Sequence, residues 1–268
     1  MGEPPLLGGF SFLYICDMVS VQAVYRTLQD LANKDQKGFI TPAVFNRFAS
    51  LAQINIYNEL FQELVKAKQI SRKNFDPGRD KSVRKQTLED LSVFIVSDRL
   101  VQAVQDNIFL KPDNLSKIIS MSTGGNTRAD IDFTVDTQYS RKEIEIIYDT
   151  EKIDRILTSN LSSPTQDYPV ALISEDIEVF PSGIQSIRLT YYRRPGSIDV
   201  DGNIVDASPT YVESSLNGIS VFNPDVSLNF MLPSHYDNEL VMEIGKLIGV
   251  RLRDPNLTAY TIKEEETE

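Results

Sequence analysis

Hydrophobic residues recur at helical spacing along the first third of the chain. In the first predicted helix the apolar side chains share one face, formed by Val21, Val24, Tyr25, Leu28 and Leu31. Ser20 can cap this helix, and a polar segment ending at Gly38 follows it. Thr41 and Pro42 then supply an N-cap and a proline at the first position of a second helix, which is predicted to run to about Lys68. The two helices are expected to form a hairpin.

The pattern changes from about residue 111, where short apolar runs separated by turns replace the helical period. Alternation and turn residues predict strands over 143–148, 169–173, 177–180 and 187–192, with a short helix over 151–158. The last two of these strands are expected to form a small antiparallel meander. A final amphipathic helix is predicted from Asp237 to about Arg251, and Asp254 followed by Pro255 stops it.

Together these elements predict an α+β fold, in which a helical bundle with long amphipathic helices carries an inserted small antiparallel β-rich module. The expected parts are an N-terminal arm (1–17), the bundle (18–110), the β-rich module (111–232), and a C-terminal helix that packs on the bundle, with an acidic tail (233–268). The apolar stretch within the arm has no Lys or Arg before it, which argues against a secretory signal peptide.

Composition excludes several classes of function. The chain of 268 residues has 27 Lys and Arg against 38 Asp and Glu, a net charge of −11, which disfavours binding of nucleic acid over the whole surface. No apolar run is long enough to span a membrane. A single cysteine, Cys16, and a single histidine, His235, disfavour a disulfide framework, a metal site and a Ser-His or Cys-His dyad. His235 is expected to be solvated or bonded to backbone, and we expect no metal and no cofactor.

One stretch, residues 66–85, is locally basic despite the acidic balance. Its basic residues are Lys66, Lys68, Arg72, Lys73, Arg79, Lys81, Arg84 and Lys85. Asp76 and Asp80 are its acidic residues, and the segment that begins at Asp76 breaks any helix there. One interpretation is a solvated loop. The other is a segment that docks on an acidic partner or touches a nucleic-acid backbone, with Arg72, Lys73 and Arg79 as the candidate partner-contact residues.

Motifs that carry chemistry are missing. The sequence has no GxGxxG, P-loop or G-x-S-x-G pattern, and the S-x-x-K match at 82–85 lacks its companion motifs. Asp199, Asp201 and Asn203 imitate the start of a calcium loop, but the sixth position is not Gly and the twelfth is Thr210. We interpret them as a tight turn. No carboxylate pair stands out for glycoside hydrolysis, so no catalytic residue is assigned and the chain is not expected to be an enzyme.

Four segments, taken in order, carry a resemblance. They are NKDQKGFITP at 33–42 with the residues up to Gln53, IDRILTSNLSSPTQDYP at 153–169, YYRRP at 191–195, and FMLP at 230–233 with the helix that ends near Asp254. The first resembles the opening of virion structural proteins of crAss-like and related tailed phages. The third is similar to a strand-turn-strand module of head-to-tail connector proteins, and the fourth fits the C-terminus of the same family. The resemblance spans about residues 19–254.

The resemblance implies a ring protein of the phage neck, usually in twelve copies, which joins portal to tail and forms part of the channel for DNA. Its partners would be copies of itself, the portal protein, adjacent tail or ring proteins, and genomic DNA passing without sequence recognition. An acidic channel lining would repel that DNA. The alternatives are another tail or baseplate component, a soluble scaffold or binding module outside the virion, and a glycosidase that uses two carboxylates.

Overall fold

The computed structural model describes residues 18–34, 40–73, 79–124, 141–216 and 219–251, and the chain divides into two compact units. Unit 1 combines Met1–Val93 with Pro195–Glu268, and unit 2 is Phe94–Arg194. Unit 2 is therefore inserted between two halves of unit 1.

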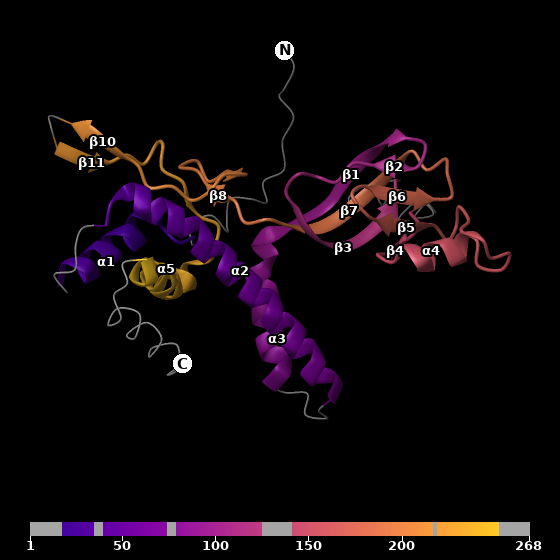
Figure 1. Ribbon diagram of the computed structural model, residues 1–268, viewed down its shortest axis with the longest axis horizontal. Coiled ribbons are helices and arrows are strands. Elements are labelled where there is room, and N and C mark those ends of the chain that lie inside the picture. Colours follow the sequence, from indigo (N-terminus) through magenta and orange to yellow (C-terminus); the bar gives the residue numbers. More distant parts are fainter. Residues whose placement is uncertain (1–17, 35–39, 74–78, 125–140, 217–218, 252–268) are drawn as a thin grey trace, which may run out of the picture. The chain divides into compact units, whose positions relative to one another are not determined.

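Unit 1 is built around its helices, which are α1 (Val21–Lys34), α2 (Pro42–Lys73), α3 (Arg79–Leu91) and α5 (Asp237–Arg251). Thr41 caps α2 as predicted, because its carbonyl and hydroxyl oxygens accept from the first turn. Helix α5 packs against both α1 and α2, and α3 packs along α2 (Figure 1). The predicted helices starting near residues 20, 42 and 237 are confirmed.

Two small sheets complete unit 1. One has the order β12-β8-β9, from strands β8 (Ser197–Ile198), β9 (Ile204–Val205) and β12 (Asn229–Phe230). The other is the hairpin of β10 (Glu213–Leu216) and β11 (Ile219–Phe222). Rings from three parts of the chain hold the base of this hairpin, because Tyr211 lies 4.1 Å from Tyr25 and 5.1 Å from Phe222 between centroids.

Two side-chain amides of α2 fix the returning chain of unit 1. The buried Gln53 donates from Nε2 to the Gly196 carbonyl (2.7 Å) and accepts at Oε1 from the Met231 amide (2.8 Å). Two turns earlier, Asn46 forms the same reciprocal pair with the backbone of Tyr211. Each amide thus satisfies a backbone donor and acceptor that irregular chain leaves without a ladder partner.

Unit 2 is a seven-stranded sheet of order β3-β7-β1-β2-β6-β5-β4 (Figure 1). Its strands are β1 (Ile95–Gln105), β2 (Ile108–Phe109), β3 (Leu115–Thr123), β4 (Glu145–Ile147), β5 (Val170–Ile173), β6 (Ile177–Phe180) and β7 (Ser186–Arg193). All neighbours are antiparallel except β4 and β5, which are parallel and joined through helix α4 (Thr150–Leu157). The predicted strands near 143–148, 169–173, 177–180 and 187–192 and the short helix are confirmed. The expected meander of the last two strands was wrong, because β6 and β7 are not neighbours in the sheet.

The two outer strands of this sheet approach each other. The Ile144 amide donates to the Met121 carbonyl at 3.0 Å, the Thr123 amide donates to the Lys142 carbonyl at 2.9 Å, and Ser122 bridges Glu143. The sheet therefore curls into a nearly closed barrel. Its interior is filled by a cluster of buried side chains: Phe109, Met121, Ile144, Ala171, Ile177, Val179, Ile184, Ile187, Leu189 and Tyr191.

The predicted fold class was wrong. The described residues form twelve strands in three sheets, and the β-rich part is a seven-stranded, nearly closed sheet rather than a small module on a bundle with long helices. Helix α2 is 32 residues long, whereas the other α-helices have 8 to 15 residues.

Strand β1 shows why the pattern misled. It lies within the predicted bundle. Val96 and Val101 are five positions apart, so in a regular strand they would face opposite sides of the sheet, yet both pack on the interior cluster. A register shift between Val96 and Arg99, with Asp98 at φ 60°, changes which side chains face inward. The alternation that would have revealed the strand is therefore broken.

Candidate functional site

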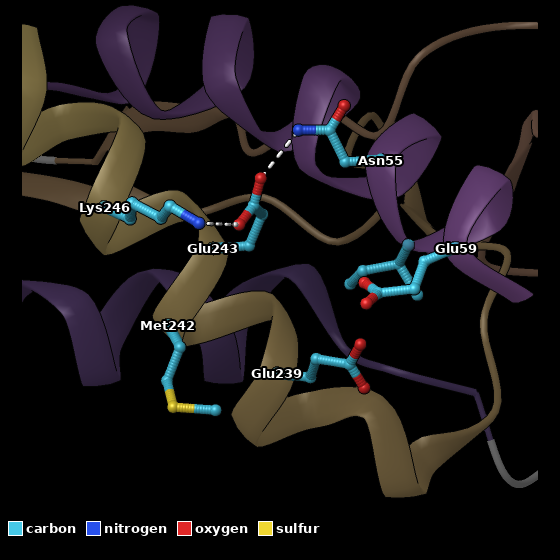
Figure 2. Close-up of a pocket in the computed structure, with 7 residues that line it drawn as sticks. Asn55, Glu59, Glu239, Met242, Glu243 and Lys246 are labelled. Carbon is cyan, nitrogen blue, oxygen red and sulfur yellow. Dashed lines mark hydrogen bonds and ion pairs between the residues drawn. The ribbon is translucent and has the colours of Figure 1, made fainter. Parts of the chain in front are cut away.

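A cleft of about 390 Å³ lies between α2 and α5 in unit 1. Figure 2 shows the residues that line it: Asn55, Ile56 and Glu59 of α2, and Glu239, Met242, Glu243 and Lys246 of α5. Three of these side chains are carboxylates and one is an ammonium group. We call this the acidic cleft, defined by Glu59, Glu239 and Glu243.

Helical spacing explains how each wall of the acidic cleft arises. Asn55 and Glu59 are four residues apart on α2, and Glu239 and Glu243 are four residues apart on α5, so each pair shares a face. Asn55 Nδ2 donates to Glu243 Oε1 at 2.6 Å, and Lys246 Nζ lies 3.7 Å from Glu243 Oε2. Glu59 and Glu239 extend toward one another across the opening (Figure 2).

Further carboxylates extend this negative charge. Glu63 lies one turn beyond Glu59 on α2, and its pKa is raised, first by burial and then by repulsion from Glu59. Asp90, at the end of α3, accepts from the Tyr236 hydroxyl at 2.9 Å, and His235 Nε2 lies 3.3 Å from it. Burial, followed by the hydrogen bond to Asp90, raises the pKa of Tyr236 well above its usual range.

Three carboxylates that line one cleft suit recognition of a cation. The cleft is lined by the three carboxylates, Asn55, Lys246 and the apolar residues Ile56 and Met242, and its lining contains no hydroxyl, thiol or imidazole. Among the residues that the structure describes, no group of His, Cys, Asp and Glu is arranged to hold a metal ion. An ammonium or guanidinium group matches the charge of these carboxylates.

The structure places the predicted contact residues at adjoining helix ends. Arg72 and Lys73 end α2, which continues past its predicted end at Lys68, and Arg79 begins α3. The interpretation of 66–85 as one loop was therefore wrong, since both flanks of the break are helical. The side chains of 67–84 lie outside the described part of the chain, as does Cys16.

The other sequence expectations have mixed outcomes. The tight turn is confirmed, because Asp199 accepts from the Asn203 amide (2.7 Å) and side chain (3.1 Å), which lowers the pKa of Asp199, and Gly202 adopts φ 81°. His235 was expected to be solvated or bonded to backbone, but its Nε2 lies 3.3 Å from a carboxylate oxygen of Asp90. Tyr191 and Tyr192 both lie in β7 and both are buried.

A charged cluster in unit 2 had no signal in the sequence. Arg141, whose side chain is 3% exposed, reaches both carboxylate oxygens of Asp98 at 2.5 and 2.7 Å, and Arg188 lies 3.4 Å from the same carboxylate. Asp98 adopts φ 60°, a conformation that Asp tolerates better than most residues. A register shift and two partners distant in sequence created this cluster, and neither leaves a local pattern.

In the part of the chain that the structure describes, no helix is long and apolar enough to cross a membrane. A scan against protein-family models gives no match, and a search of the curated proteins finds no significantly similar sequence.

Proposed function

We propose that the chain is a virion structural protein, a subunit of a ring in the neck of a tailed phage that joins portal to tail and forms part of the DNA channel. Its work is mechanical, and its working surfaces are those that bind other subunits. The proposal draws on the ordered resemblance of residues 19–254 to connector proteins. The correction of the fold class leaves that resemblance in place, because it rests on motifs and their order.

The structural observation that supports an assembly subunit is the β10–β11 hairpin. Phe222 stacks on Tyr211, so Val221 and Ile219 face the opposite side, where they are 43% and 67% exposed. A two-stranded hairpin is only marginally stable in water, and exposed apolar strands favour pairing with another chain. The exposed apolar face of this hairpin is suited to burial against a neighbouring subunit.

Averaged cryo-electron microscopy of intact particles, focused on the portal vertex, tests the proposal. We expect density for this chain in a closed ring coaxial with the portal, which would also give the copy number. Neighbouring rings resolved at side-chain detail without this chain would reject the role. A position elsewhere in the tail would favour a tail or baseplate component, and absence from purified particles would favour a scaffold outside the virion.

A further inference from the structure

We infer that the β10–β11 hairpin of each copy pairs edge to edge with the hairpin of the next copy, so that the hairpins of a ring form one continuous antiparallel sheet. In this contact β10 of one copy lies beside β11 of its neighbour. The inference rests on the proposed function and deepens it, because it names the partner of the hairpin and the backbone groups that bind that partner.

The hydrogen-bond register of the hairpin determines which backbone groups face outward. The Asn223 amide donates to the Val212 carbonyl at 3.0 Å, so these two residues form a bonded pair. Along an antiparallel ladder, bonded pairs alternate with pairs whose N–H and C=O groups point away from the partner strand. Ser215 and Ser220 oppose each other three positions further along. Their backbone groups therefore point to the two outer edges of the hairpin.

Both outer edges are open to a further strand. Among the described residues the hairpin is a separate two-stranded sheet, and no third strand pairs with β10 or β11. Edge strands usually avoid pairing through charged side chains, proline or a bulge. Residues 214–222 contain no charged residue and no proline, and the pairing of the two strands is regular. The side chains along both strands are exposed at Ser214, Ser215, Ile219, Ser220 and Val221.

A second copy of the chain fits both edges at once. Because the rotation between neighbours in a many-membered ring is small, equivalent strands of adjacent copies point in nearly the same direction. Since β10 and β11 are antiparallel within one hairpin, β10 of one copy and β11 of the next are antiparallel too. This contact is heterologous, and when it closes into a ring it leaves no edge unpaired. A single foreign strand would cover only one of the two edges.

Charge also favours this contact between copies. Two chains that each carry a net charge of −11 repel each other over most of their surfaces. Glu213 is the single charged residue of the hairpin, and the Tyr211 hydroxyl of the same chain donates to it at 3.2 Å. Pairing β10 with β11 of a neighbour places no two like charges opposite each other. It also brings Ile219 and Val221 of one copy beside the outer face of the next hairpin, which covers part of their exposed apolar surface.

Proline substitution at the two outward positions tests the inference. Ser215→Pro and Ser220→Pro each remove an outward N–H, whereas the bonds within the hairpin remain, because proline is accepted where the N–H points away from the partner strand. Host cells supply the full-length variant and the wild type in equal amounts, and mass spectrometry of purified particles measures both. We expect each proline variant to be incorporated at least about tenfold less than the wild type.

The matched controls are Ser215→Ala and Ser220→Ala, which remove the same hydroxyl group but keep the N–H. We expect both alanine variants to be incorporated like the wild type. Circular dichroism of the purified chains checks that all four variants fold. Normal incorporation of the folded proline variants, or an equal loss with alanine and proline, would overturn the inference.

Disulfide cross-linking tests the contact without a proline variant. Two chains, both carrying Cys16→Ser, enter the same particles. One also carries Ser214→Cys, and the other carries Val221→Cys or, for a register shifted by two residues, Ile219→Cys. Between copies these positions form the pairs that lack mutual hydrogen bonds, in which Cα atoms are only about 4.5 Å apart. We expect disulfide-linked dimers of the two chains after mild oxidation, and none when Glu151→Cys on α4 replaces the β11 cysteine.

The outcomes separate this inference from the proposed function. Cross-linked dimers no more abundant than in the α4 control would overturn the edge pairing. If the wild-type chain nevertheless forms a ring at the portal vertex, the proposed function stands and another surface joins the copies. Absence of the wild-type chain from purified particles would remove the proposed function, and the edge pairing of ring subunits with it.

Discussion

At the scale of single residues, side-chain amides replace backbone partners in unit 1. Gln53 and Asn46 sit on α2 at positions where an apolar residue would satisfy the helical pattern, yet each bonds one backbone N–H and one C=O of distant chain. They stabilise the fold by giving these backbone groups a hydrogen-bond partner, because a buried polar group without one costs about 1–3 kcal/mol.

Gln53→Leu is expected to lower the free energy of unfolding by about 2–4 kcal/mol, because it leaves the Met231 amide and the Gly196 carbonyl without their partner. Chemical denaturation measures the change. The control is Gln62→Leu on the exposed side of the same helix, with an expected change within about 0.5 kcal/mol. Equal effects of the two substitutions would contradict the role of Gln53.

Glu63 makes stability depend on pH. Its folded pKa is raised by burial and Glu59, so the folded chain holds this proton to a higher pH than the unfolded chain does. Stability is therefore lost as pH rises from the unfolded pKa, near 4.3, through the folded value. Glu63→Gln is expected to raise the thermal midpoint at pH 7 and to change it little at pH 4. Glu175→Gln, an exposed carboxylate, is the control for loss of one charge. A midpoint that rises equally at both pH values would refute this.

At the scale of elements, the register shift in strand β1 is held in place by contacts of Asp98. The Asp98 carboxylate pairs with two arginines, Arg141, which precedes β4, and Arg188, which belongs to β7. The same stretch of β1 forms a second bond, because the Asp98 amide donates to the Thr190 hydroxyl at 3.2 Å. The bulge is thus fixed by the Asp98 carboxylate and by a hydrogen bond from the Asp98 amide to a side chain of β7.

Asp98→Asn keeps the tolerance for positive φ but removes the charge that two guanidinium groups face. We expect a loss of about 3 kcal/mol in unfolding free energy, since Arg141 is almost fully buried. The exposed pair of Lys152 and Glu145 supplies the control, where Glu145→Gln is expected to cost less than about 1 kcal/mol. Denaturation curves that coincide for the two variants would disprove the role of burial.

The β10–β11 hairpin gives a prediction that separates folding from assembly. Ile219→Thr removes an apolar side chain that is 67% exposed, so the unfolding free energy should change by no more than about 0.5 kcal/mol. Incorporation of the variant into particles, measured by quantitative mass spectrometry of purified virions, should fall. Normal incorporation would show that a neighbouring subunit does not cover this face of the hairpin.

At the scale of the whole molecule, the net charge of −11 opposes contact with DNA. In an electrophoretic mobility shift assay, we expect the purified chain not to shift double-stranded DNA at about 150 mM salt, where each phosphate contact is already weakened.

We also expect the lumen of the proposed ring to be richer in Asp and Glu than its outer surface. A lumen lined by Lys and Arg would contradict this.

The sequence predicted individual elements better than their assembly. Helices with a clear apolar face, such as α1, α5 and α4, and strands with intact alternation, such as β6 and β7, were located to within a few residues. Closure of the seven-stranded sheet was not predictable, because it depends on Ile144 and Met121 pairing at the outer strands across a long interval. In the candidate site the basic residues were visible as a local run. The acidic cleft was not, since helices far apart in sequence build it.

The inserted unit has a consequence for how its gene can change. It begins with β1 and ends with β7, and these strands pair with each other, with Ile95 opposite Tyr192. Paired strands lie about 5 Å apart, so the chain enters and leaves the insert at nearly one point. A DNA segment encoding residues 94–194 can therefore be deleted, shortened or exchanged without stretching the flanking chain. Exchange of this segment would leave the sequence of the helical unit, residues 1–93 and 195–268, unchanged.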